Sequence, residues 1–183
     1  MNRISILVLV AFAIAAAGCS SGSGHDPIIT PSFSASFLAE EPNPGDETVS
    51  AHEGATIGSQ VTVEIRVTGT NDIYGATFDL IFDPSMVNFV DFTEGSLLEQ
   101  GGQSPDYVVQ QPQSGQLIVT VTRQGNVPGV DASGTVTLIG LTFEVFQEGS
   151  SVVFFTASEL LDDQPTPQPI PNLDWFGGAL TGT

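Results

Sequence analysis

The residues that decide this fold are Val61-Thr62-Val63-Glu64-Ile65-Arg66-Val67-Thr68, in which apolar and polar side chains alternate without a break. Successive side chains of a β-strand point to opposite faces of its sheet. Alternation over eight residues therefore predicts a strand with one face in an apolar core and the other in water. The run 74–82 follows the same rule and ends at Asp83-Pro84, because proline cannot donate to a strand ladder.

Seven further strands are predicted from short runs of Val, Ile, Thr, Phe and Tyr separated by Gly, Pro, Asn and Asp. They cover 34–39, 87–92, 107–111, 116–123, 135–146, 151–155 and 175–180. Nine short strands with turns between them predict an all-β fold, a nine-stranded antiparallel β-sandwich, with a barrel as the alternative. Apolar residues lie on both faces of 135–146, which indicates either a bulge near Ile139 or cover on both sides.

The start of the chain is typical of an export signal. Met1-Asn2-Arg3 carries one positive charge, 4–17 is almost wholly apolar, and Ala16-Ala17-Gly18-Cys19 follows. This ending resembles the lipobox of bacterial lipoproteins, in which the cysteine becomes the first mature residue and carries lipid. An ordinary secretory signal is the alternative. We therefore expect a signal peptide at 1–18, a flexible tether rich in Ser and Gly at 19–32, and one domain at 33–183.

The charge of the chain excludes several classes of function. All 21 acidic residues follow Cys19, together with only two basic residues, Arg66 and Arg123, and there is no lysine. Such a surface repels nucleic-acid phosphates and anionic lipid headgroups, so we expect no nucleic-acid partner and membrane contact only through lipid on Cys19. The absence of lysine also excludes a Schiff base. With one cysteine in the chain, no intrachain disulfide can form.

The order of the predicted strands resembles that of cohesin domains. The resemblance spans about residues 34–181 and is carried by 61–67, 74–87, 92–98, 134–145 and the closing Gly177-Gly178-Ala179-Leu180. The Phe82-Asp83-Pro84 stop is its most specific piece. It implies a jelly-roll sandwich that is a binding module and no enzyme. It also implies a partner called dockerin, a small helical calcium-binding domain docked by one flat sheet face, in assemblies for polysaccharide degradation or cell-surface attachment.

The outward face of 74–82 is the predicted partner-binding surface. It carries Gly75, Thr77, Asp79 and Ile81, a small, flat and partly apolar set that suits an amphipathic helix. The resemblance implies Asn and Asp at the positions that Gly75 and Thr77 occupy here, so no binding residue carries over by identity. If Val136 and Leu138 face outward, they extend this surface.

The sequence gives less support to calcium binding and to sugar stacking. The carboxylate pairs Glu40-Glu41, Asp46-Glu47 and Asp162-Asp163 offer oxygen ligands for calcium, but their spacing matches no calcium loop, so we expect solvated acids and no cofactor. The rings of Tyr74, Tyr107 and Trp175 could stack on sugars, although Trp175-Phe176 is more typical of core. We expect His25 in the tether and His52 in a polar loop.

The sequence is thus interpreted as a lipid-anchored, non-catalytic module of the cell envelope that captures a dockerin-like protein. Ser20 after Cys19 implies, by the lipoprotein resemblance, delivery to the outer membrane or cell surface. Two alternatives stay open: a module that binds polysaccharide directly, and a structural part of a surface assembly.

Mass spectrometry of the protein purified from its native membrane tests the predicted anchor. We expect the mature chain to begin at Cys19 and to carry lipid, and Cys19→Ser to abolish both lipid attachment and membrane retention. Recovery of a chain that still begins at Met1, or of an unmodified Cys19 in the membrane fraction, would contradict the prediction.

Overall fold

A computed structural model describes residues 34–183, and these residues form strands and connecting loops without a helix. The predicted signal peptide at 1–18, the lipidation residue Cys19 and the tether at 19–32 lie outside the described residues. No described helix is long and apolar enough to cross a membrane. The strands form two sheets, one of six strands and one of five.

The first sheet has the strand order β1-β11-β9-β4-β7-β6, and every neighbouring pair in it is antiparallel. Its strands are β1 (Ala35–Ala39), β4 (Ile73–Ile81), β6 (Asp106–Gln113), β7 (Gln116–Thr122), β9 (Gly149–Asp162) and β11 (Gly178–Gly182). The central strand β4 pairs with β7 on one side and β9 on the other, so its position in the sheet is fixed from both edges.

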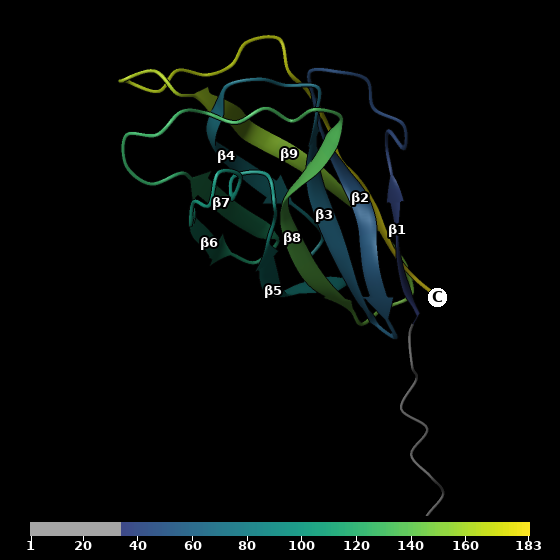
Figure 1. The fold of residues 1–183 in the computed structure, drawn as a ribbon. Coiled ribbons are helices and arrows are strands. Elements are labelled where there is room, and N and C mark those ends of the chain that lie inside the picture. The colour runs from purple at the N-terminus through teal and green to yellow at the C-terminus, as the bar shows by residue number, and fades with distance from the viewer. Residues whose placement is uncertain (1–33) are drawn as a thin grey trace, which may run out of the picture. The chain divides into compact units, whose positions relative to one another are not determined.

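The second sheet has the order β10-β2-β3-β8-β5. Its strands are β2 (Thr48–Ile57), β3 (Gln60–Thr68), β5 (Val87–Glu94), β8 (Thr135–Val145) and β10 (Asp174–Phe176). Only the pair of β10 with β2 is parallel among the described strands. Figure 1 shows β2, β3 and β8 side by side in front of β4 and β7. The prediction of an all-β sandwich of two sheets is therefore confirmed.

The core lies between the two sheets and is built by the alternation seen in the sequence. Val61, Val63, Ile65 and Val67 of β3 are fully buried, and so are Ala76, Phe78 and Leu80 of β4. The aromatic rings interlock edge to face: Phe78 lies 5.4 Å from Phe155, and Phe82 lies 5.2 Å from Phe143, between ring centroids. The described residues contain no cysteine, so burial of this apolar surface stabilises the sandwich without a disulfide.

The structure contains eleven strands where the sequence predicts nine, and β2 is the strand that the prediction missed. Its sequence, Thr48–Ile57, contains Ser, His, Glu and Gly and shows little apolar alternation. The placement of His52 in a polar loop was wrong, since its side chain is buried in β2 beside Ser50, with 2.9 Å between Nε2 and Oγ. Burial, reinforced by the Arg66 guanidinium, lowers the pKa of His52 below its ordinary value, which favours the neutral ring.

The two remaining predictions about strand shape have different outcomes. The register between β3 and β8 shifts at Ile65/Arg66, so that Ile139 and Thr137 face consecutive residues of β3, and the predicted bulge near Ile139 is confirmed. The predicted strand 175–180 is interrupted at Gly177, which separates β10 in one sheet from β11 in the other. A Cβ on Gly177 would overlap the backbone carbonyl of Val153 and crowd the Cα of Phe154, so only glycine fits this crossing.

Two phenylalanines on opposite faces of the same sheet provide a matched test of the core. Phe78 is fully buried, whereas Phe154 is 46% exposed. We expect Phe78→Ala to lower the free energy of unfolding by about 3–5 kcal/mol because it leaves a cavity, and Phe154→Ala to change it by less than about 1 kcal/mol. Chemical denaturation measures both. Equal losses for the two variants would contradict the assignment of inner and outer faces.

Candidate binding face

The four predicted partner-binding residues lie on the outer face of β4, in the middle of the six-stranded sheet. Because Ala76, Phe78 and Leu80 point into the core, Gly75, Thr77, Asp79 and Ile81 alternate with them and point away from it. Thr77, Asp79 and Ile81 are half-buried among their neighbours in the sheet, and Gly75 is buried. The sheet therefore brings all four together in one row.

The polar members of this row are tied to β7. Asp79 Oδ2 accepts a hydrogen bond of 2.8 Å from Gln116 Nε2. The hydroxyls of Thr77 and Thr120, which face each other across the strand pair, lie 3.4 Å apart. These contacts fix the orientation of polar groups in the centre of the face.

An apolar surface extends from Ile81 across the edge of the same sheet. We call it the outer patch, and it consists of Leu38, Ile81, Val152, Phe154 and Ala179. The strand register makes it continuous: Leu38 is opposite Ala179, Ala179 is opposite Val152, and Phe154 is opposite Ile81. Leu38, Val152 and Phe154 are 73%, 64% and 46% exposed. Contiguous apolar surface of this kind on a strongly charged domain is typical of an interaction site.

The outer patch is hollowed as well as apolar. A groove of about 500 Å³ is lined by Leu38, Val152, Phe154 and Ala179, together with Gly178 and Glu40. Glu40 Oε2 accepts a 3.0 Å hydrogen bond from the Gly177 backbone, which fixes this lining carboxylate in place. A shallow apolar groove can receive bulky side chains from a helix or a loop.

The charges on this face are all of one sign. Asp79, Asp106 and Glu159 lie on the outer face of β4, β6 and β9. The two arginines of the described chain lie elsewhere: Arg66 on β3 is paired with Glu64 at 2.7 Å, and Arg123 is buried after β7. The described part of this face therefore carries carboxylates and no basic side chain.

The condition set for Val136 and Leu138 in the sequence analysis is not met, and three residues of this face were not predicted. Val136 and Leu138 do not extend this face, because they lie on β8 in the other sheet, where Leu138 is fully buried and Val136 packs against the core. Leu38, Val152 and Phe154 were not predicted as site residues. The run Val152-Val153-Phe154-Phe155 carried a signal, since it is apolar on both faces.

The aromatic residues considered for sugar stacking are engaged in internal contacts. The Trp175 ring packs against Phe155 and Phe78, with centroid distances of 5.1 and 5.9 Å. Tyr107 stacks on Phe92, its hydroxyl donates to the Gly95 carbonyl, and burial raises its pKa above the usual value. The Tyr74 hydroxyl donates to the Gly125 carbonyl. The expectation that Trp175 belongs to the core is confirmed.

Two carboxylates that the sequence analysis considered as calcium ligands accept hydrogen bonds from the backbone of loop residues. Asp162 Oδ1 accepts from the Gln168 backbone at 2.7 Å, and Asp163 Oδ2 accepts from that of Gly129 at 3.1 Å. Residues 34–183 contain no group of three or more His, Cys, Asp or Glu side chains placed to hold a metal. At the end of β4, hydrogen bonds from Ser85 hold the pKa of Asp83 below its usual range.

Comparisons with known proteins agree with this architecture. The model of the family described as "Cohesin domain" matches residues 47–170. A type II cohesin dyad from the adaptor scaffoldin ScaA of Acetivibrio cellulolyticus superposes with a TM-score of 0.60 at 16% identity, over 74% of this chain and 48% of the dyad. The chain therefore spans about half the length of that protein. No curated protein matches the chain in sequence.

Two single cohesins from the same organism are similar over almost their whole length. The sixth cohesin of scaffoldin B, solved in complex with a mutant Cel5 dockerin, has a TM-score of 0.55 at 18% identity and covers 81% of this chain and 97% of its own. A type II cohesin domain of the cellulosome has a TM-score of 0.55 at 16% identity and covers 82% and 95%. At sequence identities this low, the structural similarity establishes a shared fold alone.

Proposed function

Because this chain belongs to the cohesin domain family, we propose that it is a non-catalytic module that captures a dockerin-like protein on the outer face of its six-stranded sheet. The observation that carries the proposal is the outer patch, an exposed apolar surface continuous with the row Gly75, Thr77, Asp79 and Ile81. The cohesin of scaffoldin B named above, which shares the fold, was solved with a dockerin bound.

The chemistry of the face defines the partner that it fits. Leu38, Val152 and Phe154 would be the apolar anchors, since binding energy concentrates in a few large side chains that become fully desolvated. The ordered polar groups of Thr77 and Asp79 would fix the register of the partner through hydrogen bonds. An amphipathic helix presents apolar and polar side chains on one face in this way.

The charge of this face further restricts the kind of partner that it can bind. Asp79, Asp106 and Glu159 lie on the same outer face as the apolar surface, and no basic side chain of the described face neutralises them. A partner helix with Lys or Arg beside its apolar stripe would be attracted during approach, and an acidic one would be repelled. This complementarity acts mainly on the association rate, so we expect association to slow as salt is raised.

We also propose that the module works on the outside of the cell, held by lipid on Cys19. The lipobox-like residues 16–19 support this placement, and Ser20 supports the outer membrane or cell surface as the destination. A flexible tether at 19–32 would give the domain reach from the lipid surface. There it would hold a dockerin-bearing protein, for example an enzyme of polysaccharide degradation, at the cell envelope.

Charged substitutions in the outer patch test the binding face. We expect Phe154→Asp and Ile81→Arg each to weaken binding of purified dockerin modules encoded in the same genome by at least about 30-fold, because each removes a desolvated apolar contact. Isothermal titration calorimetry measures the change. Val90→Arg is the matched control, since Val90 is 46% exposed on β5 of the other sheet.

Comparison with the control variant shows which results would refute the proposal. Val90→Arg should bind as the unchanged protein does, and all three variants should keep their circular dichroism spectra. Equal losses in Val90→Arg and Phe154→Asp, or full binding by Phe154→Asp, would refute a site on the six-stranded sheet. Retention of the unchanged protein on insoluble polysaccharide with no dockerin binding would instead favour a carbohydrate-binding module.

A further inference from the structure

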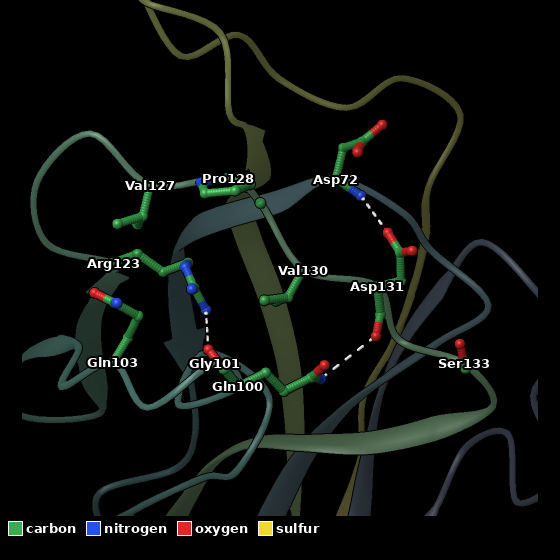
Figure 2. A pocket seen from close by; sticks show the side chains of 11 residues that line it. Asp72, Gln100, Gly101, Gln103, Arg123, Val127, Pro128, Val130, Asp131 and Ser133 are labelled. Carbon is green, nitrogen blue, oxygen red and sulfur yellow. Dashed lines mark hydrogen bonds between the residues drawn. The ribbon is translucent and has the colours of Figure 1, made fainter.

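We propose that the pocket beside Arg123, at the loop end of the sandwich, binds a small organic monocarboxylate. The pocket has a volume of about 590 Å³ and lies where β4 begins and β7 ends. Its walls come from the turn after β5 and from the loop between β7 and β8, as Figure 2 shows. It is distinct from the outer patch, with which it shares no residue.

Arg123 is the basic group of this pocket, and its hydrogen-bonding capacity is only partly used. The side chain is 95% buried, since 5% of its surface is exposed. Its Nη1 donates to the carbonyls of Leu98 and Gln100, at 2.7 and 3.0 Å. Its Nε is buried and donates to no described residue. No hydrogen bond joins Nη2 to the described chain either, so one whole edge of the guanidinium lacks an acceptor.

No carboxylate of the described chain neutralises this guanidinium. The only ion pair within residues 34–183 joins Arg66 to Glu64, on the other sheet. Asp131 lines the same pocket, but its Oδ1 accepts a 3.0 Å hydrogen bond from the Asp72 backbone. Burying an arginine without a counter-charge is costly. The chain has 21 acidic residues, yet none of those described forms an ion pair with Arg123. The missing counter-charge is therefore best supplied by a ligand.

The geometry of the free edge selects a carboxylate. Nε and Nη2 point in parallel along one side of the guanidinium, and a carboxylate bridges such an edge with two parallel hydrogen bonds. Nη2 lies at the pocket wall, where a Cβ added to Gly101 would be 3.9 Å from it. Nε is buried, so a ligand that bridges both nitrogens must displace the atoms that cover Nε.

The remaining walls restrict the charge and size of the ligand. Asp72 and Asp131 line the pocket and would repel a dianion such as sulfate more strongly than a monoanion, which favours a single negative charge. Val127, Pro128 and Val130 provide apolar contact for a carbon skeleton, and the amides of Gln100 and Gln103 can bond polar substituents. Figure 2 shows these groups around one opening, with the Gln100 amide donating to the Asp131 carbonyl.

NMR titration of the protein with sodium D-glucuronate tests the proposal, and D-glucose is the matched control because it carries a hydroxymethyl group where glucuronate carries the carboxylate. Sodium acetate tests whether a bare carboxylate suffices, and sodium chloride controls for ionic strength. We expect saturable shifts of the Arg123 Nε–H and of the Gly101 and Gly129 amides with glucuronate, and none with glucose or chloride. Arg123→Lys should bind at least about tenfold more weakly, because it keeps the charge and loses the bidentate edge.

A second variant keeps the test decisive if Arg123→Lys does not fold. Val127→Trp should fill the pocket and abolish the shifts while Arg123 remains in place. Phe154→Asp should bind glucuronate normally, which separates this pocket from the proposed docking face. The proposal is overturned if neither carboxylate produces saturable shifts, if glucose produces the same shifts as glucuronate, or if Val127→Trp binds unchanged. In each of those cases Arg123 serves only to bond the carbonyls of the 98–100 turn.

Discussion

The alternation of side chains along β4 is the constraint on which the rest of the structure depends. Its inward residues Ala76, Phe78 and Leu80 are fully buried, and they belong to one apolar core together with the buried residues of β3 and β8. A shift of one residue in β4 would exchange its two faces, which makes the register costly to change. The same packing that stabilises the sandwich therefore decides which side chains are displayed on its outer face.

Strands with strict alternation could be predicted from sequence, and strands with irregular backbones could not. β3 and β4 were found because Val61 to Val67 and Ala76 to Phe82 follow period two. β9 was found only over 151–155, although it continues to Asp162, because Ala157 adopts a positive φ of 47° and interrupts the alternation. β2 was missed because its outward residues Ser50 and His52 are polar yet buried.

The candidate sites differ in the same way: a site on one strand could be predicted from the sequence, and a site formed by several segments could not. The row on β4 could be predicted because one strand carries it. The outer patch depends on pairing Leu38 with Ala179 and Ala179 with Val152, residues from three strands that the sequence does not place side by side. Arg123 appeared in the sequence as the end of a strand, and its burial depends on the turn at 98–100 folding over it. Topology, which alternation alone does not determine, creates both features.

The central claim is that a partner protein binds the outer face of the six-stranded sheet, and methyl NMR on the complex tests it most directly. Methyl groups of Leu38, Ile81 and Val152 report on this face, and those of Val90 on β5 and Ile57, exposed at the end of β2, report on the other sheet. The account predicts that a bound dockerin module shifts the first set and leaves the second unchanged. Shifts confined to Val90 and Ile57 would contradict it.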